Sequence, residues 1–311
     1  MGITRTNGKR ISFCWLWILA AAFFPAADIL CAQETQVPPP SPQKIVQEAV
    51  ANEVAANSST AKHMFHSRRQ TAKGSQTHLY VETNDAMAGM LIAINNRPVT
   101  PQQEQAEKDR LAWLMNNPDQ LRKKHAREKE DTDRSLRILR ALPDAFRYEY
   151  AGTQNSEAGL GREGDQLVRL DFSPNPAYSP PSRVEQVLEG MQGYLLIDTT
   201  ANRLARIDGT LAHDVSFGWG LIGRLDKGGH FLVDQADVGD NCWELTRMNL
   251  NITGKILVFK SISMISDETF SDFQRVPDNL PFAKGVELLT AERDKMAHAE
   301  PSSPNTDKKN P

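Results

Sequence analysis

Cysteine is scarce in this chain of 311 residues, which has only Cys14, Cys31 and Cys242. Three cysteines cannot form the disulfide framework that stabilises small secreted domains. The chain also lacks a basic excess, because 36 Lys and Arg residues stand against 39 Asp and Glu residues. A general nucleic-acid binder needs a basic surface, so this charge balance argues against that class. With 19 Gly and 18 Pro residues, the chain is not collagen-like either.

The longest hydrophobic run is short and lies near the N-terminus, at residues 13–24. As a helix its 12 residues would extend about 18 Å, too little for a bilayer core of roughly 30 Å. Arg5, Lys9 and Arg10 precede it, and such a basic segment is typical of a secretory signal peptide. The small residue Ala32 predicts cleavage there, so we expect a signal peptide at 1–32 and a periplasmic or secreted protein. An uncleaved membrane anchor is the alternative.

Proline and polar residues predict extended segments at both ends of the mature chain. Residues 33–42 contain a Pro-rich stretch that favours a stiff, extended tether. Residues 297–311 are polar, have nothing to bury, and are expected to form a disordered tail. A single folded domain is therefore expected over 43–296. Within it, Cys242 is predicted to be an unpaired thiol, half-buried in a strand beside Trp243.

Two regions have helical patterns. The first is 43–57, and its apolar residues recur on one face of a helix; they are Ile45, Val46, Ala49, Val50 and Val54. The second is an insert at 100–142. It begins with Thr100-Pro101-Gln102-Gln103, which reads as an N-cap, a proline in the first turn and a capping-box glutamine.

The insert is expected to contain three helical segments. Asn117-Pro118 repeats the start signal, so the first segment should stop near Met115 and a second should begin. A third, weaker segment is expected to end at Pro143. The charged run 122–131 mixes basic and acidic residues, which favours a solvent-exposed helix face over an anion-binding patch. Leu111, Leu114 and Leu139 are expected to let the insert cover a sheet as a lid.

The remaining chain has the alternation and turn chemistry of β-strands. Short turns join most of these strands, whereas parallel pairs need crossovers of a dozen residues, so the sheet should be antiparallel and curled. The predicted strands are 61–71, 75–83, 86–95, 146–153, 166–173, 192–199, 203–211, 215–223, 229–238, 243–252, 255–266 and, more weakly, 268–276. One turn is placed at Thr253-Gly254. The expected fold class is mainly antiparallel β with helices (α+β).

No motif that carries chemistry is complete. Residues 159–164 spell G-x-G-x-x-G, but a strand-like pattern follows instead of the helix that dinucleotide binding requires. His213-Asp214 has no G-x-S-x-G elbow to complete a hydrolase triad. His63 and His66 would face opposite ways on a strand, and H-E-x-x-H is absent. We therefore expect no catalytic residues, no metal, no cofactor and no enzyme activity.

Motifs in four of the predicted strands resemble those of a known fold family. GYLLID at 193–198 and LARIDG at 204–209 are consecutive strands with a shared cadence, and GGHF at 228–231 and WELT at 243–246 follow. This pattern resembles the periplasmic carriers of outer-membrane lipoproteins and their relatives, the LolA/LolB-like fold. The resemblance implies an incompletely closed barrel of about eleven antiparallel strands, with helices as a lid over a hydrophobic cavity that holds acyl chains.

The function expected from this reasoning is an exported, non-enzymatic protein that shelters a lipid or a lipoprotein acyl chain. Its partners would be a lipid or an acylated protein, with envelope proteins as further partners and no nucleic acid. The candidate cavity residues are the large apolar strand positions Leu195, Ile197, Phe231, Val233, Met248, Leu250, Ile252, Leu257 and Phe259. An ordinary packed core is the alternative for each of them. The same fold could also be an envelope structural module with a filled interior, or a hydrolase assembled from distant residues.

Overall fold

The computed structural model describes residues 40–58, 61–218, 223–256 and 260–299. The chain divides into two units, Met1–Pro39 and Pro40–Pro311, and the described residues belong to the second. The signal peptide expected at 1–32 and most of the tether lie outside the described residues. So do the cavity candidates Leu257 and Phe259.

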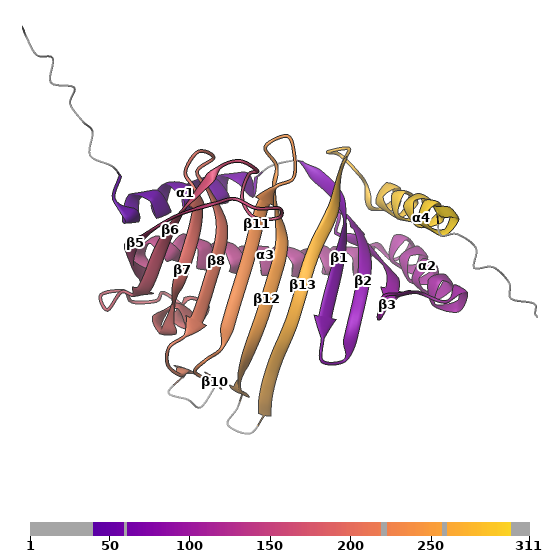
Figure 1. Cartoon of the computed structure of the whole chain (residues 1–311). Coiled ribbons are helices and arrows are strands. Elements are labelled where there is room, and N and C mark those ends of the chain that lie inside the picture. Colours follow the sequence, from indigo (N-terminus) through magenta and orange to yellow (C-terminus); the bar gives the residue numbers. More distant parts are fainter. Residues whose placement is uncertain (1–39, 59–60, 219–222, 257–259, 300–311) are drawn as a thin grey trace, which may run out of the picture. The chain divides into compact units, whose positions relative to one another are not determined.

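Thirteen strands form one antiparallel sheet (Figure 1). They are β1 (Lys62–Thr71), β2 (Gly74–Val81), β3 (Ala88–Ile94), β4 (Arg97–Pro98), β5 (Phe146–Asn155), β6 (Gln166–Pro174), β7 (Met191–Asp198), β8 (Arg203–Leu211), β9 (Val215–Phe217), β10 (Gly223–Leu225), β11 (His230–Asp237), β12 (Trp243–Ile256) and β13 (Lys260–Val276). Their order is β4-β3-β2-β1-β13-β12-β11-β8-β7-β6-β5, and the short β9 and β10 branch from β12. Among the described residues β4 and β5 do not pair, so the sheet stays open. This confirms the expected fold class, a curled and incompletely closed antiparallel sheet with helices.

The turn predicted at Thr253-Gly254 is wrong, because β12 runs through both residues. Gly254 pairs with Leu225 of β10. A Cβ atom on Gly254 would lie 2.2 Å from the carbonyl oxygen of Arg224. This glycine therefore lets β10 and β12 approach closely and does not form a turn. The predicted strand 255–266 starts too early, because residues 255–256 belong to β12. Its part from Lys260 onward joins the predicted strand 268–276 in one strand, β13, with an irregularity where Asp272 adopts a φ of 58°.

The expected strand at 215–223 is divided between β9 and β10, which pair with each other as a small hairpin. The glycine-rich segment 159–164 lies in the connection between β5 and β6, with Gly159, Gly161 and Gly164 all at positive φ. It is therefore a loop between paired strands, as expected, and opens no helix.

The helices are α1 (Pro42–Ala56), α2 (Pro101–Asn116), α3 (Pro118–Ala145) and α4 (Phe282–Ala299), with a short 3₁₀ helix η1 (Glu185–Gly190). The capping box at the start of α2 is confirmed: Thr100 Oγ1 accepts from the Gln103 N–H, and Gln103 Oε1 accepts from the Thr100 N–H. The predicted break before a third helical segment is wrong, because α3 is continuous, and the predicted end at Pro143 is wrong as well, because α3 runs through Pro143 to Ala145. Ion pairs four residues apart, such as Lys129–Asp133 and Glu130–Arg134, support its polar middle.

Helix α4 has no counterpart among the sequence predictions. Its residues Phe282, Val286 and Leu289 recur at helical spacing and are buried. Because α4 continues to Ala299, the predicted tail at 297–311 begins too early. The remainder of that tail lies outside the described residues.

The helices pack at two separate places along the strand order. The first cluster joins α1 and the end of α3 to β5–β8 and consists of Val46, Ala49, Val50, Leu142, Ala145, Phe146, Leu170, Phe172, Leu188, Leu195, Ile197 and Leu204. The second cluster joins α2 and α4 to β2 and β3, with Leu79, Met90, Leu111, Leu114, Phe282 and Leu289 among its members. In the described part of β11–β13, Val276 alone belongs to either cluster. The central strands thus lie between two helix-packed ends, and a third cluster packs Trp243 of β12 with Leu160, Leu167, Leu196 and Ala205.

Replacing Asp198, at the end of β7, by asparagine is expected to stabilise the protein at neutral pH. Asp198 is fully buried, and its Oδ1 accepts the backbone N–H groups of Thr200 and Ala201 at 3.0 and 2.9 Å. Burial raises the pKa of the Asp198 carboxyl, and neighbouring Asp165 raises it further. Because the folded-state pKa lies above the unfolded-state pKa, the carboxyl favours folding at low pH, and this contribution is lost as the pH rises through the raised pKa.

An asparagine at position 198 can keep both backbone hydrogen bonds without the buried charge. Urea unfolding of Asp198→Asn should therefore show a higher midpoint than wild type at pH 7 and nearly the same midpoint at about pH 4. A difference in midpoint that does not change with pH would show that the Asp198 charge carries no such penalty.

Candidate functional site

Three of the predicted cavity positions, Leu195, Val233 and Met248, lie in one continuous row across the centre of the sheet. Leu195 of β7 pairs with Ile207 of β8, Ile207 pairs with Val233 of β11, and Val233 pairs with Met248 of β12. Residues directly opposite in a ladder point to the same face of a sheet. Leu195 packs against α1 in the first cluster. Val233 and Met248 therefore point to the helix-covered side.

A second row runs beside the first on the same face. Phe231 pairs with Gly209 on one side and with Leu250 on the other. Because Gly209 has no side chain, β8 places no side chain directly opposite the ring of Phe231. Ile252 continues the face along β12, opposite Met264.

Burial divides the predicted residues into two groups. Leu195 and Ile197 are each 1% exposed and belong to the packed first cluster. The side chains on the central strands are only half-buried: Phe231, Val233, Met248, Leu250 and Ile252. The first group is part of the core, whereas the second group forms an apolar surface that the protein covers incompletely.

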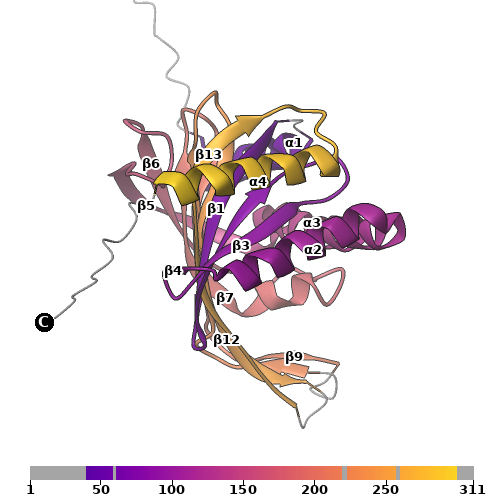
Figure 2. The same ribbon diagram turned by 90° about the vertical axis from the view of Figure 1, so that its right-hand side faces the viewer.

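Helix α3 passes across this side of the sheet. Figure 1 shows it behind the strands, running from the β5 end towards α2, and Figure 2 shows it to one side of the sheet. Its apolar contacts lie at its ends, where Leu121 packs against the second cluster and Leu139 and Leu142 join the first. Between them, residues 122–135 are almost all exposed, which agrees with the expected solvent-exposed face. Helix α3 thus connects the two clusters through a polar middle.

A pocket of about 390 Å³ lies at one end of this side, between α1, α3 and the strand ends. Leu136 and Leu139 of α3 line it, together with Glu53 of α1 and Arg203 at the start of β8. The remaining lining is mostly polar and includes Glu82, Gln235, Asn241, Cys242 and Glu244. Cys242 is half-buried and unpaired, as expected, but it lies in the turn before β12 and not in the strand. Burial raises the pKa of its thiol.

A buried ion pair forms one wall of the pocket. The Nε and Nη2 atoms of Arg203 donate to the two carboxylate oxygens of Glu53 at 2.7 and 2.9 Å. Glu53 also accepts the backbone N–H of Leu204 at 2.9 Å. The guanidinium of Arg203 lies 5.3 Å from the ring centroid of Trp243. These contacts fix the end of α1 to β8.

A histidine and two glutamates meet beside this pocket. The Nδ1 of His63 lies 2.9 Å from Oε1 of Glu244 and 4.0 Å from Oε2 of Glu82. Burial raises the pKa of Glu82, and the nearby Glu244 carboxylate adds to this. His66 has a different partner, Asp272 at 3.0 Å, so the two histidines do not share a site. No sequence motif indicates this cluster, because its members come from β1, the residue after β2 and the start of β12.

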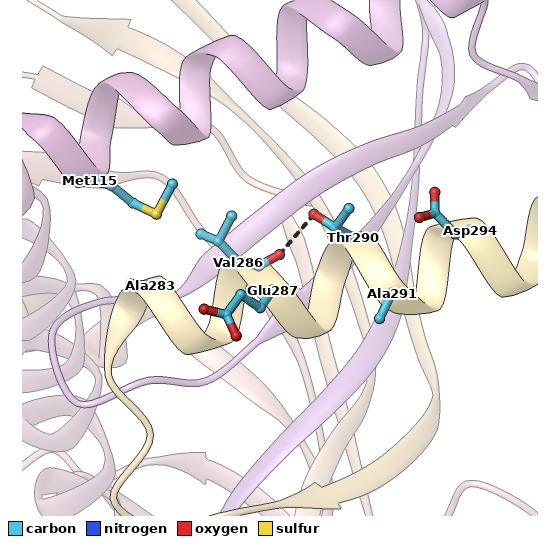
Figure 3. Close-up of a pocket in the computed structure, with 7 residues that line it drawn as sticks. All are labelled: Met115, Ala283, Val286, Glu287, Thr290, Ala291 and Asp294. Atoms are coloured by element: carbon cyan, nitrogen blue, oxygen red, sulfur yellow. Dashed lines mark hydrogen bonds between the residues drawn. The ribbon is translucent and has the colours of Figure 1, made fainter.

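A second hollow lies between α2 and α4 (Figure 3). It has a volume of about 440 Å³. Met115 projects towards α4, where Val286 lies on the facing surface and Glu287 and Asp294 flank the hollow. The hydroxyl of Thr290 donates a hydrogen bond to the Val286 carbonyl of the same helix at 3.0 Å. The hollow offers an apolar surface flanked by acidic groups, and none of the sequence-predicted cavity residues lines it.

The fold and this site define an open antiparallel sheet with packed helices at both ends and a half-buried apolar surface on β11 and β12. Neither the known protein families nor the curated proteins contain a match to this sequence. Among solved structures, the chain is similar to a DUF1329 family protein from Desulfovibrio piger, with 9% identity over 76% of this chain and 93% of that chain and a TM-score of 0.24. A similarity this low carries no argument about family or function, so the resemblance to lipoprotein carriers stays a prediction. Within the described ranges, no helix is long and apolar enough to cross a membrane.

Proposed function

We propose that this protein is an exported, non-enzymatic binding protein that shelters a lipid or the acyl chain of a lipoprotein. The observation that carries the proposal is the half-buried apolar surface of β11 and β12, which comprises Phe231, Val233, Met248, Leu250 and Ile252. It lies on the same side of the sheet as α3. A contiguous apolar surface that the protein leaves partly accessible is typical of an interaction site.

The energetics of such a site favour a long apolar ligand. Burial of one methylene group contributes about 0.8 kcal/mol, so ten methylene groups would contribute about 8 kcal/mol before the cost of ordering. The apolar contacts of α3 lie at its two ends, and its polar middle is tied to the sheet by Glu128, whose Oε2 accepts the Met87 N–H at 3.0 Å. An acyl chain that lies on the apolar surface would cover it without disturbing either packed cluster.

Equilibrium titration with a fluorescent fatty acid tests the proposal. We expect saturable binding by the wild-type protein, with the increase in fluorescence that accompanies transfer of the probe to an apolar environment. An envelope structural module with a filled interior predicts no binding. The core positions Leu195 and Ile197 fit that alternative, whereas the half-buried residues of β11 and β12 do not.

Export is part of the same proposal. The basic residues before the short apolar run 13–24 support secretion, and Ala32 supports cleavage after residue 32. A lipid shelter in the cell envelope would meet its ligand in the compartment to which this signal leads.

A further inference from the structure

We propose that His63, Glu82 and Glu244 bind a divalent transition-metal ion, with Zn²⁺ as the best match. The three residues come from three places in the sheet: β1, the residue that follows β2, and the start of β12. One possible ligand atom from each lies within 4.8 Å of the other two. Metal binding at this cluster would be independent of lipid binding, because none of the three residues belongs to the half-buried apolar surface.

The strongest single observation is the state of His63. Its side chain is 5% exposed, and its Nδ1 has no hydrogen-bond partner among the described residues. The 2.9 Å approach to Glu244 is close enough for an ion pair, but it lacks the geometry of a hydrogen bond. A buried polar atom that is left unsatisfied costs about 1–3 kcal/mol. Coordination of a metal ion by Nδ1 would remove this cost.

Neighbouring groups hold the imidazole and one carboxylate in place. The ring of Phe273 meets the ring of His63 edge-on, with centroids 6.2 Å apart and an interplanar angle of 86°. The backbone N–H of His63 donates to Oε2 of Glu82 at 2.8 Å. The residue that supplies the imidazole thus also orients a carboxylate ligand, in the way that outer hydrogen bonds orient metal ligands.

The charges at the cluster also favour a cation. Glu82 and Glu244 are half-buried carboxylates on either side of one imidazole. Of the cationic side chains nearby, Lys62 places its Nζ 3.5 Å from the Thr83 carbonyl oxygen. Arg203, which lines the same pocket as both carboxylates, pairs with Glu53. A divalent ion bound between Glu82 and Glu244 would balance the charges of both carboxylates.

The donor set selects the kind of metal. Imidazole nitrogen favours Zn²⁺ and its neighbours in the transition series over Ca²⁺ or Mg²⁺, which prefer sets made entirely of oxygen. Three protein ligands leave a fourth tetrahedral position free. Glu82 and Glu244 both line the 390 Å³ pocket, so that position would be open to water or to an anionic group in the pocket.

The test uses the full chain, freed of metal with a chelator and then titrated with Zn²⁺ in competition with a chromophoric chelator. We expect one Zn²⁺ per chain. Glu244→Gln and Glu82→Gln should each weaken binding by at least about tenfold, since even an outer-shell partner of a ligand commonly contributes that much. Both substitutions keep the size of the side chain, and circular dichroism verifies that each variant folds.

Two control variants make the test specific. His66→Gln changes a histidine on the same strand that contacts a single carboxylate, and Cys242→Ser removes the only thiol that lines the pocket, as far as the structure is described. Neither should change Zn²⁺ affinity. The assignment is overturned if the wild-type protein binds no stoichiometric Zn²⁺, if both Gln variants bind like wild type, or if a control variant loses binding. Titration of the same samples with the fluorescent fatty acid shows separately whether the proposed lipid binding holds.

Discussion

Replacing Arg203 by alanine is expected to lower the free energy of unfolding by about 3–5 kcal/mol, because it leaves a buried charge without its partner. The side chain of Glu53 is 6% exposed and receives two hydrogen bonds from Arg203. After the substitution, the backbone N–H of Leu204 would be its remaining donor among those described. The contact between Arg203 and the Trp243 ring is lost as well.

The matched control for this prediction is Arg247→Ala. Arg247 also makes two contacts with one carboxylate, that of Asp267, at 3.1 and 3.0 Å. Its pair is solvent-exposed, however, with 45% and 39% of the two side chains accessible. Exposed pairs contribute about 0–1 kcal/mol. Urea unfolding of both variants measures the difference, and equal losses would contradict the structural role of the Arg203–Glu53 pair.

Replacing Leu250 by glutamate is expected to weaken binding of the fluorescent fatty acid by more than about tenfold. The new carboxylate would lie on the apolar surface beside Phe231, and covering it with an acyl chain would require a costly desolvation. Because Leu250 is half-buried in the free protein, the loss of folding stability should stay within about 1–2 kcal/mol.

The control for Leu250→Glu is Lys123→Glu, a change of charge in the exposed middle of α3. It should alter neither stability nor binding. Unchanged affinity in Leu250→Glu would place the ligand somewhere other than the central face. Absence of binding by the wild-type protein would leave only the structural-module interpretation.

Local signals in the sequence were sufficient to predict much of the fold. The periodicity of Val46, Ala49 and Val50 predicted the buried face of α1, and all three residues are buried. Thr100 and Gln103 predicted the start of α2, and their reciprocal hydrogen bonds form as expected. These features depend on residues within a few positions of one another, which a single sequence displays directly.

The wrong sequence predictions concern residues whose structural role depends on a strand or helix elsewhere in the chain. Thr253-Gly254 has the residue types of a turn, but Gly254 lies in β12. A glycine is needed there because the backbone of Arg224 leaves no room for a side chain. Likewise, Leu195 and Leu250 have the same strand pattern, yet α1 covers the first and no packed cluster includes the second. Alternation identifies the apolar face of a strand but does not show what lies against it.

The candidate metal cluster was beyond prediction for the same reason. His63 and Glu82 are separated by 19 residues, and Glu244 is far from both in the chain. Metal motifs are recognisable in a sequence when two ligands share a helix or a loop, as in H-E-x-x-H. Here the ligands are brought together by the pairing of β1 with β2 and β13, and of β13 with β12.

Native mass spectrometry of the gently purified, exported protein tests the central claim most directly. A lipid shelter should retain its ligand, so we predict a species heavier than the polypeptide by the mass of one lipid or acyl chain, which organic extraction removes. The polypeptide itself should have the mass of a chain that begins at Gln33. A spectrum with only the unliganded polypeptide, from protein that also fails to take up added fatty acid, would contradict the proposed function.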